Sequence, residues 1–194
     1  AMTAAKIFGV DLSEVTSDQR RIAKTANFGI MYGISAFGLS QRLHISRAEA
    51  KKIIEDYFAN FPAISSYIND AIASARETGY VETLFGRRRF LPDINSRNAT
   101  VRSLAERNAV NAPIQGTSAD IIKLAMINVA KRLEQEKMTS RMILQIHDEL
   151  MFDALPEEVE ALQTIVKEEM ENVITLSIPL TVECNYGNNW LEAH

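Results

Sequence analysis

Two positively charged and two aromatic side chains recur along one stretch of the chain at the spacing of a helix face. Arg20, Lys24, Phe28 and Tyr32 would form one stripe on a helix over residues 20–33. Arg and Lys bind phosphate groups, and aromatic rings offer flat surfaces to a sugar or a base. The stripe therefore suits a nucleotide that carries a polyphosphate. The alternatives are a solvated charged face and two aromatic residues that belong to the core.

A second group with possible chemistry is the acidic sequence His147-Asp148-Glu149, which lies between two short apolar segments. Two adjacent carboxylates repel each other unless a cation joins them. Mg²⁺ is commonly held by one or two carboxylates together with substrate phosphates, so Asp148 and Glu149 are candidate metal ligands. The alternative is a solvated polar turn, and His147 alone is no argument for a zinc site.

Two further groups could contact nucleic acid. Arg107, Asn111 and Gln115 carry donors, and every base pair presents acceptors in the minor groove, so such donors would bind any correct pair. Arg87 and Arg88 belong to a basic run that could meet a phosphate backbone or only water. For the first group, helix capping and surface amides are the alternative.

The elements that must position these residues are mostly helical. We expect a short helix or turn over residues 3–15, and Thr16 to Gln19 should cap the helix that carries the stripe. Further helices are expected after Ser46 and from Pro62 to Gly79, followed by a hairpin over residues 80–91.

In the second half of the chain, we expect a helix over residues 98–111, a break at Pro113, and a long helix from residue 116 to about residue 137. A hairpin around residue 147, an acidic helix from Pro156 and a last strand near residues 180–183 should follow. Gly29 and Gly33 indicate close approach or bending, although Gly33 could simply end its helix.

The wider strings around these groups resemble one family. The pattern Arg-Arg-x-x-Lys-x-x-Asn-Phe-Gly-x-x-Tyr-Gly at residues 20–33 resembles the nucleotide-binding fingers helix, motif B, of family A DNA polymerases. Residues 143–150 look like motif C of that family, and residues 105–117 look like its palm segment near primer and template. Residues 86–92 and 189–194 are similar as well, so the likeness covers nearly the whole chain.

The resemblance implies template-directed transfer of a nucleotide from a deoxynucleoside triphosphate to a primer 3′ hydroxyl, with two Mg²⁺ ions. Arg20 and Lys24 would hold the triphosphate, and Lys24 would also donate a proton to the pyrophosphate. Phe28 would lie against the sugar and base, and Tyr32 near the templating position.

The resemblance also assigns roles to the other candidates. Asp148 would bind the catalytic metal, with Glu149 as an auxiliary group. The residues expected to contact primer–template DNA are Arg87, Arg88, Arg107, Asn111, Gln115 and His147. A template-dependent RNA polymerase is the nearest competitor, a non-catalytic DNA-binding module is another hypothesis, and a metal phosphohydrolase would need more His or Asp ligands.

The family's motif A aspartate, in a string Asp-Tyr-Ser-x-Ile-Glu, has no counterpart, and Asp11-Leu12-Ser13-Glu14 is the nearest string. We therefore expect an α+β C-terminal fragment, with a mostly helical fingers subdomain over 1–104 and part of an antiparallel-sheet palm over 105–194. The isolated fragment should be inactive and should not retain Mg²⁺. Its expected partners are the missing N-terminal part of the polymerase, primer–template DNA and deoxynucleoside triphosphates.

Composition agrees with a soluble protein and excludes several classes. No apolar run is long enough for a membrane span, and the first residues lack a signal peptide's apolar core. One cysteine, Cys184, excludes an internal disulfide and fits a cytoplasmic location. The net charge of −4 is unevenly divided, because residues 149–194 hold ten acidic residues and one basic residue (−9) and residues 1–148 carry +5.

Overall fold

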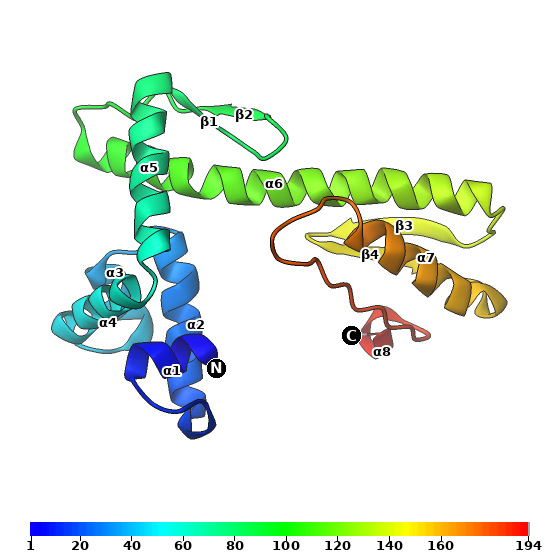
Figure 1. The fold of residues 1–194 in the computed structure, drawn as a ribbon, viewed down its shortest axis with the longest axis horizontal. Helices are drawn as coiled ribbons and strands as arrows, with labels where there is room; N and C mark the ends of the chain where they lie inside the picture. Colours follow the sequence, from blue (N-terminus) through cyan, green and yellow to red (C-terminus); the bar gives the residue numbers. More distant parts are fainter. Residues whose placement is uncertain (194) are drawn as a thin grey trace. The chain divides into compact units, whose positions relative to one another are not determined.

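The computed structural model describes residues 1–193 (Figure 1), and the chain forms two compact units that divide between Ile114 and Gln115. This division lies ten residues beyond the expected boundary between residues 104 and 105. Each unit is described separately below. No helix among residues 1–193 combines the length and the apolar character needed to cross a membrane.

The first unit is helical apart from one small hairpin. In chain order its elements are α1 (Met2–Phe8), η1 (Leu12–Glu14), α2 (Ser17–Met31), α3 (Ala36–Leu43), α4 (Arg47–Asn60), α5 (Pro62–Thr78), β1 (Tyr80–Glu82), β2 (Arg88–Phe90) and the start of α6 (Ala99–Gln135). The expected helices and the expected hairpin are present, whereas α3 was not predicted. Strands β1 and β2 are antiparallel.

Local capping explains where α2 and α4 begin. The Thr16 hydroxyl accepts a hydrogen bond from the Gln19 amide at 3.2 Å, and the Gln19 side chain accepts one from the Thr16 amide at 2.9 Å. Ser46 and Glu49 make the same reciprocal pair at the start of α4. Each pair satisfies backbone donors that a helix N-terminus leaves free, so both expected starts are confirmed.

Three apolar clusters hold the first unit together. One joins α1, α2 and α4 around Tyr57, and a second joins α3 to α4 through Leu39 and Ala50. A third packs β1 and the loop after β2 against α6, with Val81 and Ala109 among its buried residues. The nucleotide-type stripe is therefore carried by a helix whose opposite side belongs to a core.

The expected break at Pro113 is wrong, because α6 runs without interruption from Ala99 to Gln135. A proline within a helix cannot donate to the carbonyl four residues earlier and crowds it. Packing close to the proline offsets this local cost, since Ala109 and Ala112 are buried in the cluster beneath β1. The Tyr67 hydroxyl also donates to the Val110 carbonyl at 2.9 Å, one turn before the proline.

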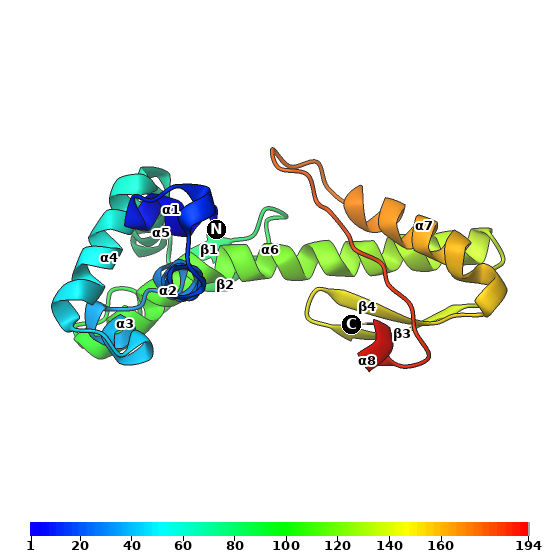
Figure 2. The ribbon, with the colours of Figure 1, turned by 90° about the horizontal axis from the view of Figure 1, so that it is seen from below.

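The second unit contains the rest of α6, β3 (Arg141–Ile146), β4 (Glu149–Asp153), η2 (Pro156–Glu158), α7 (Val159–Glu171) and α8 (Trp190–Ala193). Helix α7 runs beside the second half of α6 (Figure 2), and Val129 and Leu133 pack against Leu162 and Ile165. Strands β3 and β4 pair antiparallel with a bulge between Met142 and Leu144. The expected hairpin and acidic helix are confirmed.

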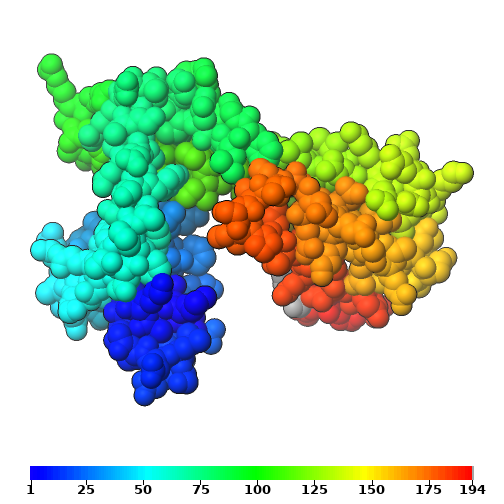
Figure 3. All heavy atoms as spheres, in the orientation of Figure 1, coloured from blue at the N-terminus to red at the C-terminus, as the bar shows by residue number. Residues whose placement is uncertain are grey.

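The strand expected near residues 180–183 is absent among the described residues. The chain between α7 and α8 lies at the surface of the second unit (Figure 3), and its Ile178 is exposed. The backbone there hydrogen-bonds to side chains of α7, since the Val182 amide donates to Glu171 at 2.8 Å. Its apolar, β-branched sequence predicted a strand, but no strand among residues 1–193 pairs with it.

Candidate active site

The four residues of the stripe are all exposed, and the opposite side of α2 is buried. Phe28 and Tyr32 keep 53 % and 48 % of their surface accessible, while Ala23 and Ala26 are buried. Two large aromatic rings at the surface are not core residues, so that alternative interpretation of the spacing is excluded. Helix α2 ends at Met31, and Tyr32 is its C-cap, so the expected extension to residue 33 is wrong by two residues.

The two cations of the stripe are available to an anion. Arg20 and Lys24 are exposed, and neither forms an ion pair with any other part of residues 1–193. Their neighbour Arg21 differs, because its guanidinium lies 3.4 Å from the Asp18 carboxylate. The helix therefore presents Arg20 and Lys24 unneutralised, one turn apart, on the same side as Phe28.

Gly33 follows the C-cap of α2 and allows a close approach. Its φ of +69° is in the left-handed region, and a Cβ atom there would lie 2.6 Å from the Cγ atom of Arg107. Real side chains do not pack at that distance, so only glycine fits without moving Arg107. This contact brings Arg107, a predicted DNA-contacting residue, to the Tyr32 end of α2 within the first unit.

In the basic hairpin, Arg88 already has partners. Its Nε donates to Glu82 at 2.6 Å, and its guanidinium carbon lies 4.5 Å from the centre of the Tyr80 ring. The hydrogen bond to Glu82, followed by the charges of Tyr80 and Glu82, raises the pKa of Arg88. Arg87, which directly precedes β2, and Arg89, within β2, are also exposed. The expectation that Arg87 and Arg88 contact DNA stays a prediction.

The other two minor-groove candidates follow on successive turns of α6. Asn111 is partly buried, and Gln115 is exposed and begins the second unit. Both belong to α6, which also contains Pro113.

The acidic turn is the tip of the β3–β4 hairpin. Ile146 pairs with Glu149, so Glu149 begins β4 and the turn consists of His147 and Asp148. His147 has a left-handed φ of 54°, and its carbonyl accepts a hydrogen bond from the Gln145 side chain at 2.7 Å. This bond supports the shape of the turn. The Asp148 side chain is exposed.

The carboxylates at this turn could supply some of the oxygen ligands that a hard cation needs. The Asp148 carboxylate has no hydrogen bond or ion pair to any residue in 1–193, and the adjacent Glu149 supplies a second carboxylate. Carboxylate oxygens are the ligands that Mg²⁺ takes from proteins, usually one or two with phosphates and water completing the shell. No group of three His, Cys, Asp or Glu side chains converges within residues 1–193, so these two carboxylates are what the chain itself can offer.

A buried serine fixes the base of this hairpin. The Ser140 hydroxyl and amide both donate to the Glu158 carboxylate, at 2.5 Å and 2.8 Å, and the Thr139 amide donates to it at 3.0 Å. These bonds, chiefly the one from the Ser140 hydroxyl, hold the pKa of Glu158 below its ordinary value. The start of β3 is thereby tied to the segment that leads into α7.

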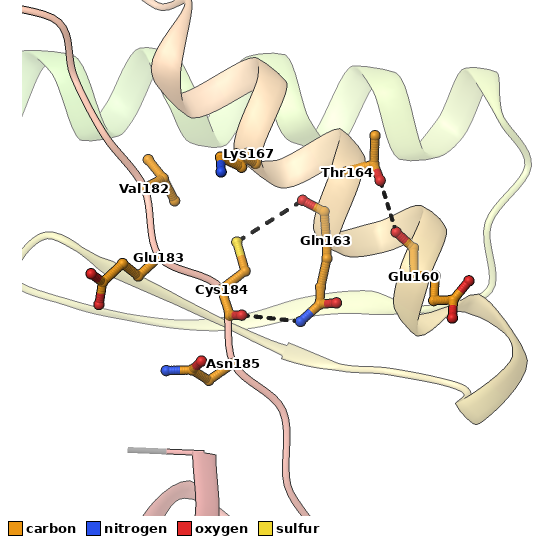
Figure 4. A pocket seen from close by; sticks show the side chains of 8 residues that line it. All are labelled: Glu160, Gln163, Thr164, Lys167, Val182, Glu183, Cys184 and Asn185. Carbon is orange, nitrogen blue, oxygen red and sulfur yellow. Dashed lines mark hydrogen bonds between the residues drawn. The ribbon is translucent and has the colours of Figure 1, made fainter.

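An open groove of the second unit contains none of the predicted site residues. It lies between α7 and the chain around Cys184 (Figure 4), and its lining residues are Glu160, Gln163, Thr164, Lys167, Val182, Glu183, Cys184 and Asn185. Gln163 donates to the Cys184 carbonyl at 3.1 Å, and burial raises the pKa of the Cys184 thiol. Cys184 packs against the apolar cluster of the second unit.

Comparison with known proteins identifies the class of protein to which the chain belongs. A sequence model described as DNA polymerase family A matches residues 1–192. The chain is 52 % identical over 191 residues to DNA polymerase I of Geobacillus stearothermophilus and 48 % identical over 192 residues to DNA polymerase I of Pseudomonas aeruginosa. These matches cover 98 % and 99 % of this chain but 22 % and 21 % of the relatives, so the chain spans about a fifth of their length.

A solved structure agrees with both the fold and the class. It is described as the POL domain of Pol1 from M. smegmatis in complex with DNA primer-template and dNTP. The two share a TM-score of 0.95 and 46 % sequence identity, over 98 % of this chain and 34 % of that one. The fold, α+β with mostly helical fingers and part of an antiparallel palm, is that of a nucleic-acid polymerase.

Within that class the chain belongs to DNA polymerase family A. Its relatives are the bacterial enzymes named DNA polymerase I. The expected family is therefore confirmed, and the roles of individual residues remain to be tested.

Proposed function

We propose that this chain supplies the nucleotide-binding helix and part of the palm of a template-directed DNA polymerase that works in the cytoplasm. Its substrates would be primer–template DNA and deoxynucleoside triphosphates, and the rest of the enzyme would be an N-terminal part that precedes these residues. The relatives' names support this proposal, as does the presence of primer-template and dNTP in the M. smegmatis complex. We keep the assignment of residues 1–104 to fingers and 105–194 to palm as part of the proposal.

The observation that carries the proposal is the exposed stripe of α2. Arg20 and Lys24 are unpaired cations within the described chain, and Phe28 and Tyr32 are exposed rings on the same helix. In the proposed reaction the primer 3′ hydroxyl releases its proton to water as its oxygen forms a bond to the α-phosphorus, while the bond from that phosphorus to the pyrophosphate oxygen breaks. Lys24 would give its proton to the departing pyrophosphate, and the Arg20 guanidinium would stabilise the negative charge of the pyrophosphate.

The hairpin tip of the second unit would supply acidic groups for the reaction. Asp148, assisted by Glu149, would hold Mg²⁺, which when bound lowers the charge repulsion between the primer oxygen and the triphosphate. His147 would approach the primer end, and Arg107, Asn111 and Gln115 would donate to minor-groove acceptors. Ile143 and Leu144 of β3 are 59 % and 51 % exposed, which supports a further part of the enzyme covering this sheet.

The test is primer extension by the longer polymerase that contains this chain, with two matched carboxylate variants. Asp148→Ala should abolish extension and leave primer–template binding unchanged, because the proposed role of Asp148 is chemical. Asp153→Ala removes an exposed carboxylate at the other end of β4 and should retain activity. Full extension by the Asp148→Ala variant would refute the assignment.

The isolated chain of 194 residues should neither extend a primer nor hold Mg²⁺ tightly, because Asp148 and Glu149 would lack a third carboxylate. Extension of a labelled primer by the purified chain would overturn this expectation. The same assay tests the alternative of a non-catalytic DNA-binding module. Salt-sensitive duplex binding by the longer protein, with no response to Mg²⁺ and triphosphate, would favour that module.

A further inference from the structure

The side of α2 that faces the core is made largely of small residues. Ala23, Ala26 and Gly29 are buried, with Ile30 as the one large side chain among the buried residues of this helix. The larger side chains on this side of the helix are Ile30 and the partly buried Ile22, and Gly29 leaves room for the side chain of Ile34. Because apolar contacts have little directional preference, a directional hydrogen bond on this side of α2 would add to what sets the rotation of the helix about its axis.

One buried polar contact joins α2 to α4. The Tyr57 hydroxyl donates a hydrogen bond to Oδ1 of Asn27, with an oxygen–oxygen distance of 2.7 Å. Tyr57 has no exposed surface, and its ring lies 5.0 Å from the ring of Phe61 and 5.9 Å from that of Phe58. The ring that carries the donor is fully buried among other aromatic rings, so the bond favours the position of Asn27 that reaches this hydroxyl.

The acceptor of this bond stands next to the residues with proposed chemistry. Asn27 directly precedes Phe28 and follows Lys24 by three positions, which places it about 60° from Lys24 and about 100° from Phe28 around the helix. A rotation of α2 large enough to break the bond would move both side chains. We infer that Tyr57 is a positioning residue, which sets the rotation of α2 and so the direction in which Lys24 and Phe28 meet the nucleotide.

This inference rests on the proposed function, and it is tested in the longer active polymerase with Tyr57→Phe. The variant keeps the ring and its packing and loses only the hydroxyl. We expect KM for the incoming nucleotide to rise roughly three- to tenfold, the range that the loss of one buried hydrogen bond produces. At saturating nucleotide the single-turnover rate should fall as well, because Lys24 is the proposed proton donor to the pyrophosphate, and primer–template affinity should not change.

Tyr67→Phe is the matched control. It also removes a partly buried tyrosine hydroxyl of the first unit, but that hydroxyl donates to a backbone carbonyl of α6 rather than to a group on α2. The control should lose a similar amount of thermal stability and keep the KM of the unaltered enzyme. A purely structural role for Tyr57 would instead give the two variants the same profile.

A double-mutant cycle with Asn27→Leu isolates the bond itself. If Tyr57 acts through Asn27, the double variant should have the KM of the worse single variant. Independent effects that multiply would overturn the inference, as would a KM within twofold of the unaltered enzyme in Tyr57→Phe. Absence of extension by the unaltered enzyme would instead refute the proposed function, so the two failures can be told apart.

Discussion

Replacing Gly33 with alanine should disturb both the stability of the first unit and the position of a predicted DNA contact. The left-handed φ of +69° costs an L-residue such as alanine about 1–2 kcal/mol. The new Cβ would lie 2.6 Å from Cγ of Arg107, but that side chain is flexible and exposed and can turn away. An unfavourable rotamer adds about 0.5–1.5 kcal/mol, so the backbone term is the larger of the two.

Gly9→Ala separates these two effects. Gly9 ends α1 with a similar φ of +63°, and a Cβ atom there would meet nothing within 4 Å. With a denaturant slope of about 1–3 kcal/mol per M, each variant should lower the urea midpoint of the first unit by roughly 0.5–1 M, Gly33→Ala slightly more. Amide hydrogen exchange in α1 and α2 would report this unit alone.

The functional readout is primer–template affinity of the longer polymerase. Gly33→Ala should weaken it roughly tenfold, the loss typical of one specific contact to bases, whereas Gly9→Ala should not. In an Arg107→Ala background the Gly33 substitution should have little further effect on affinity. The reasoning is refuted if both glycine variants bind DNA alike, or if Gly33→Ala weakens binding equally with and without Arg107.

Three other substitutions test the remaining parts of the site. Lys24→Ala should raise the nucleotide Kd and slow single-turnover transfer, each roughly tenfold or more, while Lys52→Ala, which removes an exposed lysine of α4, should change neither. Phe28→Tyr should, by family analogy, relax discrimination against dideoxynucleotides in a chain-termination assay, and an unchanged termination ratio would contradict the alignment of the stripe. Glu158→Gln should destabilise the second unit at neutral pH, because bonds from Ser140 favour the ionised carboxylate. Since the folded pKa of Glu158 is lowered, that stabilisation is present above the ordinary glutamate pKa of 4.5 and is lost as the pH falls through the folded value. The urea midpoints of the unaltered protein and of Glu158→Gln, measured between pH 3 and pH 7, should therefore converge at low pH. A constant difference between the two midpoints would contradict the stabilising role of the ionised Glu158.

The sequence predicted the elements whose signals are local. The reciprocal caps at Thr16 and Ser46 mark helix starts through bonds between residues three apart, so the local sequence is enough to predict them. Pro113 misled because the local cost of proline is real but the packing that offsets it comes from residues far along the chain. The expected strand near residue 180 failed for the same reason, since a strand needs a partner that spacing cannot supply.

The same distinction between local and long-range signals applies to the residues of the candidate site. Spacing identified the residues that could do chemistry, such as Lys24 and Asp148, because exposed functional side chains need only their neighbours on one helix or one turn. The contacts that aim them join residues distant in sequence, as Tyr57 is joined to Asn27 and Arg107 approaches Gly33. Positioning residues of this kind can change how a nucleotide or DNA binds without touching either. A substitution at Gly33 should therefore change DNA binding without removing a reacting group, whereas Lys24→Ala removes a side chain that is proposed to serve both binding and chemistry.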